Sequence, residues 1–168
     1  MKKLAALMGL VILLSACTIT VSPGDVQVGV SMEFDLSNVI TRFEPDRGRG
    51  STYYVGEDVQ FLISLRRGGY VTLVAIDPDG STYEFEYGVY LPAGTHVLPL
   101  PGMHRRYIVE PPAGKQRVRA IYTDTRPESV YFRGVYSSNG FNDRLRVYFR
   151  KCYSQVRDLK ETYFYIAY

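Results

Sequence analysis

Residues 58–87, DVQFLISLRRGGYVTLVAIDPDGSTYEFEY, contain three apolar segments separated by two turns, and this pattern decides the fold. Apolar side chains occupy every second position of residues 58–66, which is the period of a half-buried β-strand. Residues 70–77 are apolar on both faces, as expected of a central strand. The turn at 77–80, DPDG, predicts a tight hairpin because proline suits its second position and glycine accepts a positive φ.

The segment after this turn, residues 81–87, alternates aromatic and acidic side chains, so it predicts a strand with one aromatic and one acidic face. Shorter strand-like segments before and after it are separated by Gly and Pro turns at a spacing of about ten residues. They fall at residues 26–34, 39–44, 96–98, 106–110, 116–123 and 161–168. This arrangement predicts a mainly β domain, an antiparallel β-sandwich of the immunoglobulin-like type.

Residues 142–158 allow two interpretations. As a strand they alternate apolar and basic side chains, but the alternation ends at Lys151. As a helix they carry one apolar stripe at three- and four-residue spacing. The stripe comprises Leu145, Tyr148, Phe149, Cys152, Val156 and Leu159. With Asn142 or Asp143 available as an N-cap, we expect one C-terminal helix followed by the final strand.

The N-terminal segment predicts export and anchoring of the protein. Residues 4–14 form an uncharged, mostly apolar run behind two lysines, too short to span a bilayer but typical of a signal peptide. The sequence LSAC at 14–17 resembles the lipobox of bacterial lipoproteins. That resemblance implies a signal peptide at residues 1–16, cleavage between Ala16 and Cys17, and lipid attachment to Cys17. A plain signal peptide followed by an accidental cysteine is the alternative.

Processing leaves a nearly neutral domain. The 168-residue chain has 20 Lys+Arg and 17 Asp+Glu, and cleavage removes Lys2 and Lys3. Residues 17–25 form a lipidated tether, and residues 26–168 form one domain that is long enough to bury a core without disulfides. Thr18 stands where enteric bacteria place an aspartate that retains lipoproteins at the inner membrane, so we expect the outer membrane of a bacterial envelope. The balanced charge gives no reason to expect nucleic acid as a partner.

Several turn motifs follow one another in the middle of the chain. They are YVGE at 54–57, GYV at 69–71, IDPDG at 76–80, LPAG at 91–94, LP at 98–99 and EPPAG at 110–114. In this order they resemble the bacterial domain of unknown function 4384, over about residues 43–124. Residues 84–87 depart from the family, whose members often carry an apolar-Pro-Asn segment there. The resemblance implies a sandwich module of envelope proteins with no known catalytic residues.

Residues that usually carry catalysis or bind metals are sparse. His96 and His104 are the only histidines, and neither has partners at a spacing typical of a metal site. The turn at 77–80 lacks the further acidic residues of a calcium loop. Cys152 lies on the apolar stripe, where a free cysteine is usually a buried hydrophobe. We therefore predict no metal, no cofactor and no enzymatic activity, with an undetected hydrolase as the less favoured alternative.

Tyrosine is unusually frequent, with 15 residues in the chain. Its amphipathic ring suits both the edge of a core and a binding interface. The candidate partner surface comprises Tyr53, Tyr54, Tyr87, Tyr90, Tyr131 and Tyr136. We therefore predict a lipid-anchored module that binds another envelope protein.

Basic side chains provide an alternative partner. An architectural lipoprotein could contact peptidoglycan or a surface-layer polymer through clustered arginines. The candidates are Arg117, Arg119, Arg144, Arg146, Arg150 and Arg157. We expect these side chains on the solvated sides of a strand and of the helix, so the polymer contact is the second hypothesis.

Overall fold

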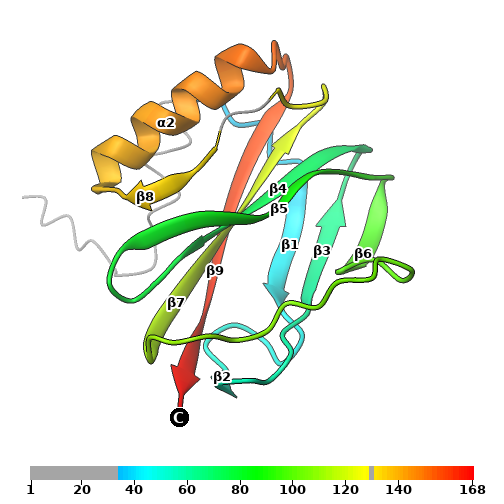
Figure 1. Cartoon of the computed structure of the whole chain (residues 1–168). Helices are drawn as coiled ribbons and strands as arrows, with labels where there is room; N and C mark the ends of the chain where they lie inside the picture. Colours follow the sequence, from blue (N-terminus) through cyan, green and yellow to red (C-terminus); the bar gives the residue numbers. More distant parts are fainter. Residues whose placement is uncertain (1–33, 129–130) are drawn as a thin grey trace, which may run out of the picture.

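The computed structural model of the protein describes residues 34–128 and 131–168. The strands, labelled in Figure 1, are β1 (Ile40–Pro45), β2 (Thr52–Tyr54), β3 (Phe61–Leu65), β4 (Gly69–Ile76), β5 (Ser81–Leu91), β6 (Gly94–Leu98), β7 (Gly114–Thr123), β8 (Arg133–Val135) and β9 (Arg157–Ala167). The helix α2 spans Ser138–Lys151. The signal peptide, the tether and the strand expected at 26–34 lie outside the described residues, except for Phe34.

The strands form two sheets, with orders β1-β3-β6 and β2-β9-β7-β4-β5-β8. The mainly β fold is therefore confirmed. Every pair is antiparallel except β2 and β9, which run parallel with Tyr53 beside Ile166, so one short parallel strand joins the sheets that the sequence predicts to be antiparallel. These two strands come from opposite ends of the described chain, and no hairpin joins them to impose an antiparallel direction.

One hydrophobic core lies between the two sheets. The ring of Phe61 in β3 stacks on Phe43 of β1 with centroids 5.5 Å apart, and lies 6.3 Å from Phe164 of β9. Val71 and Leu73 of β4 are fully buried in the same cluster. Since β4 lies between β7 and β5, it is the central strand that its apolar sequence predicts.

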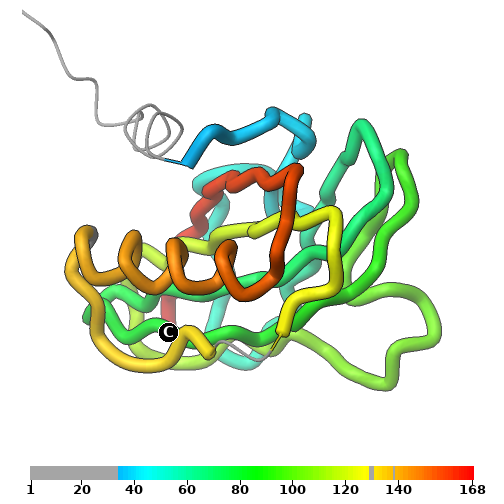
Figure 2. The backbone as a smooth tube through the Cα atoms, turned by 90° about the horizontal axis from the view of Figure 1, so that it is seen from above, coloured from blue at the N-terminus to red at the C-terminus, as the bar shows by residue number. Residues whose placement is uncertain are grey.

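The other face of the large sheet is covered by α2, which runs along the outside of the fold in Figure 2. Val74 and Ile121 of the sheet share a second core cluster with Leu145 and Tyr148 of the helix. The Tyr148 hydroxyl lies 2.9 Å from the Thr72 Oγ1 atom, so the polar end of this buried ring has a hydrogen-bond partner. This face of the sheet is closed where the helix lies on it.

The helix expected over 142–158 exists, but both of its ends differ from the prediction. Ser137 begins it by accepting a hydrogen bond from the amide three residues on, at 3.1 Å. The helix ends at Lys151, and Tyr153 takes a φ of 50°, which turns the chain out of the helical path. Strand β9 then begins at Arg157, within the segment that was expected to be helical.

Strand β5 carries two irregularities that change the faces of its side chains. Its register against β4 shifts on both sides of Leu73, which pairs with Glu86, and each shift inserts one extra residue in β5. As a result, Phe85 and Glu86 both reach Tyr107 on the side of the first core. The predicted separation into an aromatic and an acidic face is therefore wrong, and Glu86 is only 4% exposed.

The segment between β6 and β7, residues 99–113, runs across the lower end of the molecule in Figure 1. The strand expected at 106–110 forms only an isolated bridge there, between Asp58 and Ile108. Within residues 34–128 and 131–168, no helix is both long and apolar enough to cross a membrane.

Candidate functional site

A cleft of about 410 Å³ opens between residues 105–110 and the inner face of the large sheet. Strands β4, β5, β7 and β9 all contribute side chains to it, whereas no residue of β1 or β6 lines it. Its aromatic lining consists of Phe61, Tyr83, Phe85, Tyr107 and Phe164. A mostly apolar cavity of this size, with a few polar groups, has the properties of a ligand-binding site.

At one end of the cleft, the lining residues Tyr107 and Arg105 hold the buried carboxylate of Glu86, which does not itself line the cleft. Tyr107 donates from its hydroxyl to Glu86 Oε2 at 2.7 Å, and Arg105 Nη1 donates to Glu86 Oε1 at 3.1 Å. Both contacts matter because Glu86 is buried, and a buried carboxylate without partners is costly. Burial, followed by the hydrogen bond to Glu86, raises the pKa of Tyr107 above its ordinary value, so the phenol stays a donor.

Arginine charges at this end are balanced by acids. Arg105 pairs with Glu86, and its side chain remains 54% exposed. The neighbouring Arg106 donates to both carboxylate oxygens of Asp58, at 2.9 Å and 3.1 Å from its Nε atom. The two arginines that line the cleft are thus held by two carboxylates.

The other end of the cleft is acidic. Gln116 Nε2 donates to Asp77 Oδ1 at 2.8 Å, and Tyr83 is the second side chain that hydrogen-bonds this carboxylate. Burial raises the pKa of Asp77, and the negative charge of Glu110 acts in the same direction. Burial, then the charge of Asp77, also raises the pKa of Tyr83. Glu110 lines the cleft itself and is exposed.

A second cavity, of about 510 Å³, lies along the outer part of β5. Its lining includes Glu84, Tyr87 and Tyr131, and it shares Phe85 and Arg105 with the cleft. Burial raises the pKa of the Glu84 carboxyl here. The shared residues place Arg105 at the boundary between the two cavities.

Two of the six predicted surface tyrosines line this cavity. Tyr87 and Tyr131 lie with ring centroids 6.4 Å apart and stack, and Tyr90 on the same strand is 55% exposed. The Tyr87 hydroxyl donates to the carbonyl of Glu128. Tyr136 is half-buried and donates to the Arg133 carbonyl at 2.9 Å.

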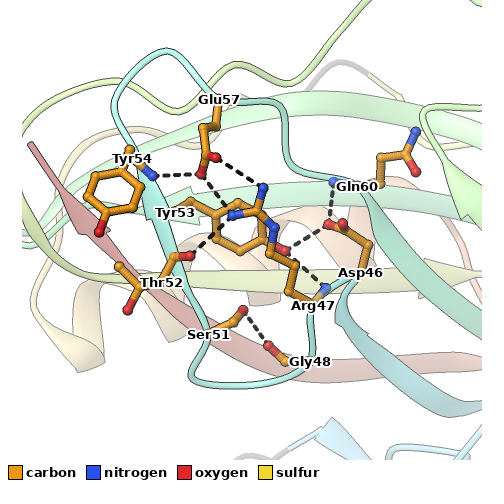
Figure 3. Close-up of polar contacts among 9 residues, drawn as sticks. All are labelled: Asp46, Arg47, Gly48, Ser51, Thr52, Tyr53, Tyr54, Glu57 and Gln60. Atoms are coloured by element: carbon orange, nitrogen blue, oxygen red, sulfur yellow. Dashed lines mark hydrogen bonds and ion pairs between the residues drawn. The ribbon is translucent and has the colours of Figure 1, made fainter.

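Tyr53 is not a surface residue. It is fully buried against Phe164, and its hydroxyl donates to Asp46 Oδ1 at 2.7 Å (Figure 3). The reason lies in the pairing of β2 with β9, which turns Tyr53 towards the first core and leaves its neighbour Tyr54 exposed. The candidate surface therefore loses Tyr53.

The loop before β2, which its glycines mark as flexible, is held by a polar network around Arg47 (Figure 3). The guanidinium lies 4.4 Å from the centre of the Tyr53 ring and donates to both carboxylate oxygens of Glu57, at 2.8 Å and 3.1 Å. The hydrogen bond from Arg47 lowers the pKa of Glu57. Asp46 Oδ1 also accepts from the Gln60 amide at 3.0 Å. These contacts stabilise the loop.

Several arginines expected to be solvated make internal contacts instead. Arg119 is buried: its Nε donates to Glu161 Oε2 at 2.7 Å and its guanidinium lies 4.2 Å from the Phe141 ring centre. Arg144 donates to the Tyr131 carbonyl at 2.7 Å. The helix covers Arg119, which is why this position does not face water.

The remaining candidates for chemistry are placed as follows. His96 Nε2 lies 2.8 Å from the Pro92 carbonyl. Cys152 is buried, and this burial raises the pKa of its thiol from 9.0 to about 11, as expected for a packed, unreactive cysteine. In the part of the chain that the structure describes, no three His, Cys, Asp or Glu residues lie close enough together to hold a metal ion.

The fold and the cleft define a mainly β domain with a cavity between a large sheet and a crossing segment. A family described as a domain of unknown function (DUF4384) matches residues 52–126, which supports the resemblance seen in the turn motifs. That segment runs from β2 to just beyond β7 and carries most of the cleft, while Phe164 and Ile166 come from β9 outside it. No curated protein and no solved structure matches the chain.

The sequence pattern did not indicate the residues that line the cleft, above all Tyr83, Arg105 and Tyr107, or the buried Glu86 that Tyr107 and Arg105 contact. The position of Glu86 could not be predicted because strict alternation assigns it to the face opposite Phe85, and the bulges in β5 break that alternation. The sequence contains one relevant signal: Tyr107 is an aromatic residue in a segment rich in turns, where a large ring buries its area by packing against another element.

Proposed function

We propose that the protein is a lipid-anchored envelope lipoprotein whose domain binds another envelope protein without catalysis, and that the cleft is the place where it binds. The observation that carries this proposal is the open aromatic cleft with polar groups at both ends. Cavities of this kind accept side chains of a partner, and aromatic residues are enriched in binding interfaces. We also propose that the two sheets form a β-sandwich of the immunoglobulin-like type.

Ion pairs made by several arginines favour a protein partner over a charged polymer. Binding of a polyanion needs exposed and uncompensated arginines, yet Arg119 is paired with Glu161 and Arg106 with Asp58. Arg146 is also paired, with Asp143. Contact with peptidoglycan or a surface-layer polymer therefore stands as the second candidate, and a hydrolase as a more remote one.

The anchor rests on residues 14–17, which lie outside the described residues. Incorporation of labelled palmitate tests it: we expect label in the wild-type protein and none in Cys17→Ala. Fractionation of the membranes then tests the outer-membrane location that Thr18 favours. Equal labelling of both proteins would refute the lipid anchor.

Position-specific crosslinking in living cells tests the binding function. A photoreactive phenylalanine analogue at Ile108, which lines the cleft and is 51% exposed, is compared with the same analogue at Tyr153, which is 78% exposed beyond the helix. We expect one dominant envelope protein to crosslink from position 108 and not from position 153.

The same experiment distinguishes the alternatives. Crosslinked material that sediments with the cell wall instead of a protein would favour the architectural function. The same set of proteins from both positions would mean that the cleft has no selective role, and the proposal would be wrong.

A further inference from the structure

The positive and negative charges around the cleft do not cancel evenly. The inference drawn from this imbalance rests on the binding function proposed above. Arg105 and Arg106, the two cations that line the cleft, are each paired with a carboxylate. At the opposite end, Asp77 and Glu110 are close enough to influence one another electrostatically. No ion pair to either acid occurs within residues 34–128 and 131–168. The uncompensated charge of the cleft is therefore negative and lies at one end.

The neutral groups at this end do not remove that charge. Gln116 and Tyr83 hydrogen-bond Asp77, but neither carries a positive charge. Both side chains also line the cleft, so a ligand that reaches them is next to the acids. A cation placed there would form charge-assisted hydrogen bonds, which are the stronger kind.

The rest of the cleft is apolar. The rings of Phe85 and Tyr107 meet edge to face with centroids 4.9 Å apart, and Phe61 lies 5.9 Å from Phe85. Phe61 and Tyr107 are almost wholly buried, whereas Phe85 is half-buried, so Phe85 is the ring against which a further aromatic side chain can pack edge to face. This part of the cleft therefore suits an aromatic or large aliphatic group.

The spacing of the two parts sets the spacing within a ligand. Tyr83 at the acidic end and Phe85 in the aromatic part both line the cleft and are two residues apart in the sequence of β5. In an extended peptide, side chains two positions apart point the same way and lie roughly 6–7 Å apart. A partner segment in extended conformation could therefore fill both parts with alternate side chains.

We propose that the cleft recognises an extended peptide segment of the partner in which an aromatic residue is followed or preceded, two positions away, by lysine or arginine. The aromatic side chain packs against Phe85, and the basic group lies beside Asp77 and Glu110. The specificity of the module is thus for basic, aromatic peptides rather than for acidic ones.

The test uses three blocked pentapeptides that differ in one residue: acetyl-Ala-Phe-Ala-Lys-Ala-amide and its Gln and Glu analogues. Binding to the full-length domain is measured by calorimetry or by NMR titration. We expect the Lys peptide to bind about tenfold more tightly than the Gln peptide, and the Glu peptide to bind most weakly. Raising the salt concentration should reduce the preference for Lys.

Substitutions in the protein test whether the acidic end of the cleft causes the preference for the Lys peptide. Glu110→Lys changes an exposed residue, so we expect it to fold normally and to prefer the Glu peptide over the Lys peptide. Asp143→Asn removes an acid on the helix, whose side chain is 72% exposed, and is the matched control that should keep the wild-type preference. Glu110→Gln should weaken Lys binding about tenfold without a change of sign.

Equal binding of the three peptides, or an unchanged preference in Glu110→Lys, overturns the proposal. A free aromatic amine, phenethylamine, that binds as tightly as the Lys peptide would assign the cleft to a small cationic molecule and also overturn it. These results are independent of the binding function: a partner crosslinked from position 108 alongside indifferent peptides keeps the function and removes only the specificity.

Discussion

The two faces of the large sheet are covered in different ways. On one face α2 packs Leu145, Tyr148 and Cys152 against β4 and β7 in a closed core. On the other face the small sheet covers one part, and at the lower end only residues 105–110 cross the strands and leave the cleft. One sheet thus has a stabilising face and a face with room for a ligand. Substitutions on the first should change stability, and those in the cleft should change binding.

The largest effect is expected under the helix. Leu145 is fully buried in the helix-side core, so Leu145→Ala removes apolar contacts and leaves a cavity. We expect the free energy of unfolding, measured by urea denaturation, to fall by about 2–5 kcal/mol. Crosslinking from position 108 should persist in the folded fraction. A loss below about 1 kcal/mol would mean that the helix is loosely packed.

The thiol of Cys152 tests whether the same face is closed to water. Burial raises its pKa from 9.0 to about 11, so near pH 8 the thiolate is about 100-fold rarer than in the unfolded chain. Iodoacetamide should therefore label the native protein at least about 100-fold more slowly than the urea-unfolded protein. Rapid native labelling would show that the helix opens or that the thiol is reactive.

The sign of the accompanying pH effect follows from the raised pKa. The folded state disfavours the thiolate, so the stabilising contribution of the neutral thiol is complete below pH 9 and is lost as the pH rises through about 11. Cys152→Ala, which has no ionisable group at this position, should lack that part of the alkaline loss of stability.

A smaller loss of stability is expected at the cleft from Tyr107→Phe. The variant keeps the ring but removes the donor to the buried Glu86, leaving one carboxylate oxygen without this partner. We expect a loss of about 1–3 kcal/mol by urea denaturation. Tyr90→Phe, at an exposed ring on β5, is the control and should change stability by less than about 0.5 kcal/mol. Equal effects would indicate that the Glu86 contact is not stabilising.

The smallest effect is expected outside both faces, in the Arg47 loop. The pKa of Glu57 is lowered from 4.5 by the hydrogen bond from Arg47, so the stabilisation by this pair is present above pH 4.5 and is lost as the pH falls through the lowered value. Glu57→Gln should lower the Tm slightly at neutral pH, and this difference should disappear in acid or at high salt. A difference that stays constant with pH would contradict the ionic origin.

The central strand and the helix could both be predicted from the spacing of apolar residues in the sequence. Residues 70–77 predict the central strand because a strand that is apolar on both faces has to be buried on both faces of the sheet. The helix followed from the three- and four-residue spacing around Leu145. The ends of the helix could not be predicted in this way. They are set by the N-cap Ser137 and by the positive φ of Tyr153, and the spacing of apolar residues carries no information about either.

The candidate site was much harder to predict. Alternation placed Glu86 on the face opposite Phe85, but two bulges bring it to the side of the first core, where Tyr107 and Arg105 hydrogen-bond it. Tyr53 was expected on the surface, and its pairing with a strand more than a hundred residues away buries it. Such long-range pairings and local register shifts are not visible in the period of a single segment.

Three local features follow from the amino-acid sequence alone: the strand periods, the turn at 77–80 and the apolar stripe of the helix. They depend on neighbours in the chain, whose spacing is fixed by covalent geometry. The match of residues 52–126 to DUF4384 is likewise a property of the sequence. The parallel strand β2, the closed face under α2 and the open cleft beneath residues 105–110 follow instead from tertiary packing. These depend on which distant segments pack together, because burial of apolar surface has no direction and is settled only when all the elements share one core.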